Sequence, residues 1–265
     1  DYSEGVKTAY PQGVQAKEFI LPKELLEQDC VISLSKMKTH ALERITGAVK
    51  NSYGFIYGFH KAKGHTQYPS ADSFARMLID LNKCVAPKLY VMDGIVAMEG
   101  NGPGSGDPVP MNVLLMSTDP VALDSVFSRL VYLKPEMVPT NYHGEKMGLG
   151  TWKEEEITLL TPDGEISMAE AVKKYGNPAF NVDRTEVRKN IWTRMAGALN
   201  IFQKKPYIEA DKCVRCGICV QSCPVPGKAV DFRKGKGKPP VYDYRKCIRC
   251  FCCQEMCPKK AIKVK

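Results

Sequence analysis

Blocks of apolar and polar residues along the first 183 residues predict strands and helices. Two helices are expected, because apolar residues recur at helical spacing after a capping residue in each: residues 70–85 and 119–132. Three short apolar runs have the length and composition of buried strands: residues 31–34, 88–98 and 111–118. The order strand, helix, strand, loop, strand, helix predicts a layered α/β domain with a mostly parallel sheet.

The C-terminal quarter has a different pattern, in which cysteine dominates. The segment before it, residues 184–205, reads as a helix and is expected to link the two parts of the chain. We therefore expect an α/β domain at 1–183, a linking helix at 184–205 and a small α+β domain at 206–265.

Two copies of one cysteine pattern, C-x2-C-x2-C-x3-C-P, stand in this small domain as CVRCGICVQSCP and CIRCFCCQEMCP. This spacing wraps three thiolates around one [4Fe-4S] cluster and supplies the fourth thiolate to the other cluster. The pattern predicts two ligand sets, namely Cys213, Cys216, Cys219 and Cys257 for cluster 1, and Cys247, Cys250, Cys253 and Cys223 for cluster 2. Cys252 is surplus and is expected to pack beneath its cluster.

Zinc is the main alternative for paired C-x2-C motifs. Zinc has no use for a third cysteine at the same interval in both runs, so iron–sulfur clusters are favoured. Disulfides are disfavoured because neighbouring cysteines of one loop make poor bridges. Thiolates that stay reduced predict a cytoplasmic protein working at low oxygen. The sequence has no apolar run long enough to span a membrane.

Positive charge is concentrated in the small domain. Residues 205–265 hold 15 Lys and Arg against 5 Asp and Glu, whereas the other residues hold 23 against 24. Part of this charge is expected to balance the anionic clusters and their thiolates. The remainder favours a redox partner protein with an acidic docking face. Few aromatic residues stand among these lysines, so nucleic acid is a poor fit.

Basic and polar residues follow the first expected strand, where open α/β sheets place their ligand sites. The candidate catalytic residues are Lys38, His40, Lys50 and Asn51. Lysine and histidine side chains at a strand end can bind an anion such as phosphate or carboxylate, or move a proton. A solvated basic edge is an equally good interpretation.

A loop of alternating glycines follows the second expected strand, with Gly100, Gly102, Gly104 and Gly106 before Asp107. Backbone N–H groups of such a loop can turn inward around an anion, which predicts a further anionic ligand in the α/β domain. The loop lacks the Lys-Ser/Thr pair of a Walker loop and precedes no helix. A plain surface loop remains the alternative. Asp119 is expected to cap a helix rather than to form a site.

Three of these stretches, KMKTH…TGAVKNSYG, DGIVAMEGNGPGSGDP and TDPVALDSVF, resemble the DUF362 family over about residues 29–150. Residues 206–265 resemble the bacterial two-cluster ferredoxins, a module often fused to that family. The resemblance implies that the first strands of the α/β domain lie upstream of residue 1. It also implies that the basic, glycine-rich and aspartate stretches belong together. It implies no particular reaction.

Three functions remain open from the sequence. The first is an iron–sulfur oxidoreductase or redox-enzyme subunit, in which two [4Fe-4S] clusters relay electrons to a substrate or cofactor in the α/β domain. The second is an electron carrier without catalysis that docks a partner enzyme. The third is an assembly factor for clusters or cofactors. A ligand retained by the α/β domain would favour the first.

Overall fold

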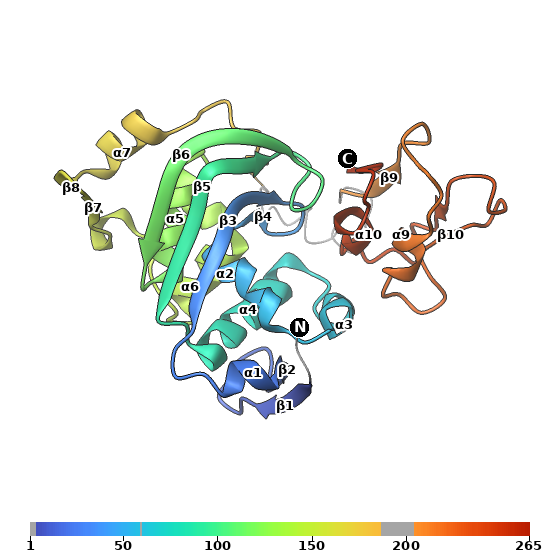
Figure 1. The fold of residues 1–265 in the computed structure, drawn as a ribbon, viewed down its shortest axis with the longest axis horizontal. Coiled ribbons are helices and arrows are strands. Elements are labelled where there is room, and N and C mark those ends of the chain that lie inside the picture. Colours follow the sequence, from blue (N-terminus) through green and yellow to red (C-terminus); the bar gives the residue numbers. More distant parts are fainter. Residues whose placement is uncertain (1–3, 59, 187–203) are drawn as a thin grey trace, which may run out of the picture.

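The computed structural model describes residues 4–58, 60–186 and 204–265, and its two domains lie side by side (Figure 1). A four-stranded sheet with the order β4-β3-β5-β6 organises the α/β domain. Its strands are β3 (Ile32–His40), β4 (Arg44–Thr46), β5 (Leu89–Glu99) and β6 (Asp107–Ser117). The three expected strands are therefore present, as β3, β5 and β6.

The expectation of a mostly parallel sheet is wrong, because the sheet is mixed. β3 and β5 pair parallel, whereas β4 pairs antiparallel with β3 and β6 pairs antiparallel with β5. The short glycine-rich loop joins β5 directly to β6. A parallel neighbour needs a crossover of a dozen or more residues, so a connection this short produces an antiparallel pair.

Helices pack on one face of the sheet (Figure 1). They are α2 (Ala48–Asn51), α4 (Ala71–Val85), α5 (Pro120–Leu130) and α6 (Pro139–Lys146). Both expected helices are confirmed: Ser70 caps α4 through a capping box, and Asp119 caps α5 by accepting from the backbone N–H groups of Val121 and Ala122. Buried Met92 and Val113 of the sheet share a core with Phe127 and Leu130 of α5.

The other face of the sheet is open and carries exposed apolar side chains, namely Ile32, Leu34, Ile95, Val96, Leu114 and Met116. The remaining elements of the α/β domain are β1 (Gly5–Ala9), β2 (Glu18–Pro22), α1 (Lys23–Leu26), η1 (Ser52–Phe55), α3 (His60–Gln67), η2 (Pro135–Met137), η3 (Glu154–Glu156), β7 (Leu159–Thr161), β8 (Gly164–Ile166) and α7 (Met168–Tyr175). None of the helices within the described residues has the length and apolar character needed to cross a bilayer.

The small domain consists of two short antiparallel ribbons and two single-turn helices. Its elements are β9 (Pro206–Ile208), α9 (Ile218–Gln221), β10 (Val230–Asp231), β11 (Val241–Tyr242), α10 (Cys252–Glu255) and β12 (Ile262–Val264). β9 pairs with β12 and β10 pairs with β11, so the first and last strands of the domain are neighbours. Most of the expected linking helix at 184–205 lies outside the described residues.

Candidate functional site

The two cysteine runs form loops with the same backbone shape. Arg215 and Arg249 have left-handed conformations, with φ of 58° and 57°. Two residues further on, Gly217 and Phe251 do the same, with φ of 79° and 61°. Residues other than glycine adopt this region rarely. Its repetition at matching places means that the two loops curl in the same way around whatever they enclose.

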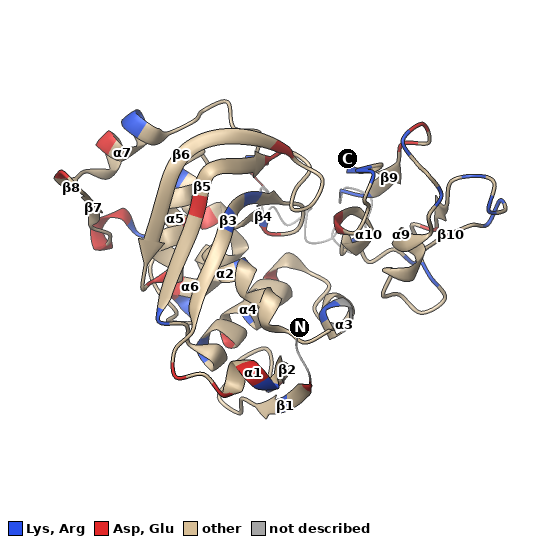
Figure 2. Ribbon diagram, in the orientation of Figure 1, with Lys and Arg blue, Asp and Glu red and all other residues tan. Residues whose placement is uncertain are grey.

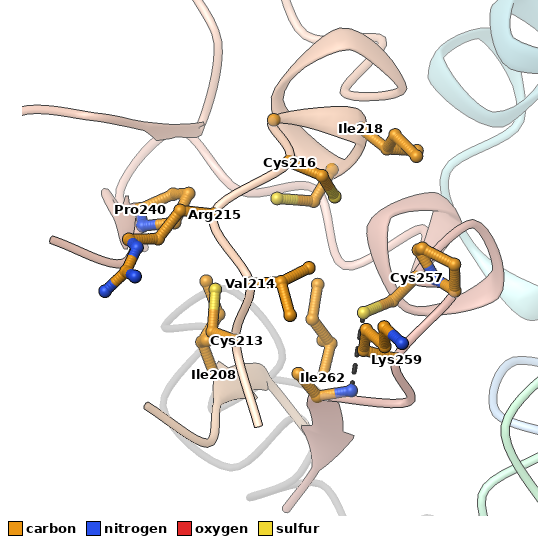
Figure 3. Close-up of a pocket in the computed structure, with 14 residues that line it drawn as sticks. Ile208, Cys213, Val214, Arg215, Cys216, Ile218, Pro240, Cys257, Lys259 and Ile262 are labelled. Atoms are coloured by element: carbon orange, nitrogen blue, oxygen red, sulfur yellow. Dashed lines mark hydrogen bonds between the residues drawn. The ribbon is translucent and has the colours of Figure 1, made fainter. Parts of the chain in front are cut away.

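Each set of predicted ligands surrounds one cavity. The first cavity is lined by Cys213, Cys216, Cys219 and Cys257, and Figure 3 shows the sulfur atoms of three of them at its border. The second is lined by Cys223, Cys247, Cys250 and Cys253. The structure therefore groups the eight cysteines as the spacing predicts, with the fourth cysteine of each run at the cavity of the other. That these groups hold iron stays a prediction.

Hydrogen-bond donors point at the cysteine sulfur atoms. The backbone N–H groups of Ala229 and Ala261 donate to the Sγ atoms of Cys223 and Cys257, both at 3.3 Å. Such bonds stabilise thiolate charge and tune a bound cluster, so both cavities fit a group that takes four thiolates. All eleven cysteines are free of disulfides. Within the described residues, no three Cys, His, Asp or Glu side chains come close enough together for a single metal ion.

The two sets of cysteines differ in their exposure to solvent. At the first, Cys216 is exposed and Val214 retains 52% of its accessible surface. At the second, Cys250, Cys253 and Phe251 are all buried. The cysteines of the first set are therefore more exposed than those of the second.

Helix α10, which follows the second cysteine loop, packs on the glycine-rich loop of the α/β domain. The side-chain amide of Gln254 donates to the carbonyl oxygens of Asn101 and Gly102, at 2.7 and 3.0 Å. Asn101 in turn donates to the carbonyl of Ile262 at 2.9 Å, and Lys260 donates to the carbonyl of Gly106 at 2.9 Å. The glycine-rich loop thus forms part of the contact through which the α/β domain holds the cysteine domain.

Close packing accounts for three of the loop's glycines. A Cβ atom on Gly102 would lie 2.2 Å from the carbonyl oxygen of Thr39. One on Gly104 would lie 2.8 Å from the carbonyl oxygen of Glu255, and one on Gly106 would lie 2.2 Å from that of Glu99. Gly100 has a left-handed φ of 71°, and exposed Asp107 begins β6. An anionic ligand in this loop stays a prediction, because packing alone explains the glycines.

A buried histidine and a carboxylate meet across the same contact. Nε2 of His40, at the end of β3, lies 3.2 Å from Oε1 of Glu255 on α10. Nδ1 of His40 accepts from the backbone N–H groups of Leu42 and Glu43, so a neutral ring carries its proton on Nε2, facing Glu255. Burial lowers the pKa of His40. Burial alone would raise the pKa of Glu255, but His40 and the charge of Lys50 lower it to about 2.

Lysine side chains gather beside this pair. Burial, followed by the charges of Lys50 and Lys36, lowers the pKa of Lys38. Lys36 itself pairs with Asp93 at 2.5 Å. The structure thus brings the predicted residues Lys38, His40 and Lys50 into mutual electrostatic range. Asn51, the fourth, donates to the carbonyl of Leu34 at 3.1 Å and so holds α2 against β3.

A buried aspartate positions helix α2, which carries Lys50. Asp124 of α5 accepts from the backbone N–H groups of Ala48 and Val49, at 2.5 and 3.0 Å. Burial raises the pKa of Asp124 to about 7 even though these donors oppose the shift. A Cβ on Gly47 would lie 1.9 Å from Oδ1 of Asp124, so glycine is needed there. The aspartate and lysine stretches of the sequence therefore meet in space.

Sequence reasoning missed Gln254, Glu255 and His65. The first two stand between cluster-motif cysteines, and no local pattern marks them as contacts to the α/β domain. His65 is buried and stacks on Phe74 with ring centroids 4.6 Å apart. Burial lowers the pKa of His65 to about 4, and Glu255 acts in the opposite direction. These residues enter the site only through tertiary contacts.

Comparison with known proteins gives two family matches. The DUF362 model, described as a domain of unknown function, matches residues 1–129, and a 4Fe-4S dicluster domain matches residues 205–258. The thylakoid-associated protein sll1697 of Synechocystis is 42% identical over 130 residues. That alignment covers 49% of this chain and 40% of the cyanobacterial protein, so the chain spans well under two thirds of that relative. No solved structure matches.

These matches coincide with the two domains of the fold. The first falls on the sheet, the glycine-rich loop and α5, and the second on the two cysteine-lined cavities. The chain therefore combines a region that matches the DUF362 family, residues 1–129, with a region that matches a 4Fe-4S dicluster domain, residues 205–258.

Proposed function

We propose that the protein transfers electrons through its cysteine domain to a substrate or cofactor site in the α/β domain. Two [4Fe-4S] clusters, when bound in the two cavities, supply one-electron transfers. The observation that carries this proposal is the position of α10. It holds Cys253 of the second ligand set, and its next two residues, Gln254 and Glu255, contact the glycine-rich loop and His40. One helical turn thus connects the second cavity to the candidate residues of the α/β domain.

Electrons enter at the first cavity in this proposal, because its cysteines are the more exposed set. Arg215 lines it and donates to the carbonyl of Gly237. The loop around Gly237 carries exposed Lys234, Lys236 and Lys238 (Figure 2). A basic rim beside the more exposed cysteines favours a redox partner with an acidic docking face, since opposite charges accelerate encounter. A reducing, cytoplasmic location suits the eight thiolates.

Anaerobic reductive titration tests the proposal directly. The reconstituted chain should accept about two electrons, one for each cluster, and should bind about eight iron atoms. Electron paramagnetic resonance of the reduced protein should show two interacting paramagnets. A chain that binds zinc in place of iron, or that accepts no electrons, would contradict the proposal.

Lys38 and Lys50 provide the positive charge for an anionic substrate in this proposal, and the adjacent His40 holds a proton on Nε2. Replacing both lysines with alanine should weaken binding of inorganic phosphate, used as a simple anion probe, by about tenfold or more. Isothermal titration calorimetry measures this affinity, and the iron content serves as the control for folding. Unchanged phosphate binding would mean that the lysines form a solvated basic edge.

A further inference from the structure

A cleft with a volume of about 410 Å³ lies between the two domains, apart from both cysteine-lined cavities. This volume is within the range of small-molecule sites in proteins. The α/β domain contributes β3, β4 and the glycine-rich loop to its walls, and the small domain contributes β9 and β12. Its charged and aromatic lining residues are Arg44, Asp183, Lys204, Tyr207, Glu209 and Lys263; His40 also lines it, but the side chain of His40 is only 1% exposed. Glu209 pairs with Lys212 at 2.7 Å, outside the cleft lining.

One wall of the cleft is a two-stranded ribbon that separates it from the first cavity. In the β9–β12 pair, Tyr207 stands opposite Lys263, and Ile208 stands opposite Ile262. Tyr207 and Lys263 face the cleft, whereas Ile208 and Ile262 line the first cavity, as Figure 3 shows from the cavity side. Neighbouring residues of a strand point to opposite faces. A ligand in the cleft is therefore one layer of ribbon away from the first cysteine set.

The opposite wall leads to the second cysteine set. His40 lines the cleft, and its Nε2 atom lies 3.2 Å from Glu255, two residues after Cys253. A ligand in the cleft thus lies next to structural elements that border both cavities.

The lining suits a planar ring that carries a negative charge. Tyr207 lines the cleft with an aromatic ring, on which flat rings can stack. Nζ of Lys265 lies over one face of this ring, 5.1 Å from its centroid, so a ligand stacks on the other face. Lys263 has no ion-pair partner within the described residues, whereas Lys204 pairs with Asp183 at 2.6 Å. Arg44 also donates to the carbonyl of Asp183 at 2.7 Å, so its guanidinium is fixed at the rim. The unpaired charge of Lys263 therefore provides an anion contact beside the aromatic ring.

We propose that this cleft binds a flavin nucleotide; the choice of a redox-active ligand rests on the proposed electron transfer. Flavins accept electrons one at a time, as clusters deliver them, whereas nicotinamides exchange hydride. Full reduction of the flavin ring takes two electrons, one from each reduced cluster, and two protons from water in the open cleft. Both clusters are reoxidised in the process. The phosphate of the nucleotide contacts Lys263, and the ring stacks on Tyr207.

Fluorescence titration with flavin mononucleotide tests the cleft on the anaerobically reconstituted full chain. We expect saturable quenching with one flavin bound per chain. Riboflavin, which lacks the phosphate, should bind at least about tenfold more weakly. Lys263→Glu should weaken flavin mononucleotide binding by at least about tenfold and leave riboflavin binding unchanged. Lys88→Glu makes the same charge change at an exposed residue that does not line the cleft, and flavin mononucleotide binding should stay unchanged.

If Lys263→Glu loses iron, its flavin affinity no longer reports on the cleft alone, and a second variant is needed. Tyr207→Ala should weaken binding of flavin mononucleotide and riboflavin alike, by about three- to tenfold. A chain that holds its full iron and accepts two electrons but binds no flavin would overturn the cleft proposal and leave the electron-transfer function standing. Flavin binding that depends on Lys263 and Tyr207, in a chain whose clusters accept no electrons, would support the cleft and overturn the electron-transfer function.

Discussion

Replacing Cys216 with alanine should halve the iron content, from about eight to about four atoms per chain. Cys216 is one of four cysteines around the first cavity, and a [4Fe-4S] cluster that loses a ligand at an exposed position is open to oxidation and loss. The α/β domain should stay folded, since its core clusters contain no residue of the cysteine runs. Iron and acid-labile sulfide assays on anaerobically purified protein measure the first effect, and circular dichroism measures the second.

Paired variants test the exchange of the fourth cysteine between the runs. Cys216 and Cys257 line the same cavity although they belong to different runs, so the variant lacking both should still hold about four iron atoms. Cys216 and Cys223 belong to one run but line different cavities, so the variant lacking both should hold almost none. A ligand set drawn from one run alone predicts the reverse order. The iron contents of the two double variants therefore distinguish ligand sets that exchange the fourth cysteine from ligand sets drawn from one run each.

Cys252→Ala is the matched control for these variants. Cys252 is as buried as its neighbour Cys253, at 8% and 7% exposure, but it lines neither cavity. The Cys252→Ala variant should therefore keep about eight iron atoms per chain. Loss of a cluster in this variant would show that Cys252 is a ligand and that the spacing assigns the second set incorrectly.

The cysteine sets could be predicted from the sequence because their spacing is a local property of the chain. Eight residues and their division into two groups follow from one repeated pattern, and the same eight surround the two cavities. The caps of α4 and α5 were predictable for the same reason, since Ser70 and Asp119 bond to N–H groups only two or three residues away.

The contact between the domains could not be predicted, because it joins residues far apart in the chain. Glu255 meets His40, and Gln254 meets Asn101, in pairs separated by more than 150 residues. Nothing in the run CQEMCP distinguishes these side chains from solvated ones. The glycine-rich loop was recognised as special, yet its glycines have a second explanation, the close approach of Thr39, Glu99 and Glu255, that the sequence does not contain.

The direction of the strands could not be predicted from the local sequence of each strand either. Length and composition located β3, β5 and β6, but apolar runs look alike whether their neighbours are parallel or antiparallel. The short β5–β6 connection is the sequence signal for an antiparallel pair, whereas its glycine pattern was interpreted only as a ligand loop or a plain surface loop. Lys38, His40 and Lys50 follow one strand within a short stretch of sequence, and the charge of Lys50 acts on both Lys38 and His40. That they form a site stays a prediction.

Gly104→Val should separate α10 from the α/β domain while both clusters stay bound. The Cβ atom of the new side chain would lie 2.8 Å from the carbonyl oxygen of Glu255, and a backbone atom cannot turn away as a side chain can. Overpacking of this kind costs about 1–3 kcal/mol. That cost acts on a contact held by a few hydrogen bonds, including the two from Gln254 to Asn101 and Gly102. Hydrogen–deuterium exchange should therefore show lost protection in residues 101–106 and 252–256.

The iron content separates this effect from misfolding of the cysteine domain. It should stay at about eight atoms per chain, because Gly104 lines neither cavity. Gly237→Val is the matched control, since a Cβ there meets nothing within 4 Å, and its exchange should equal that of the unaltered chain. Gln254→Ala removes the two hydrogen bonds without a clash and should loosen the same segments less. Unchanged protection in Gly104→Val would mean that the glycine-rich loop does not hold α10, and the proposed route from the second cavity to His40 would then lack its structural support.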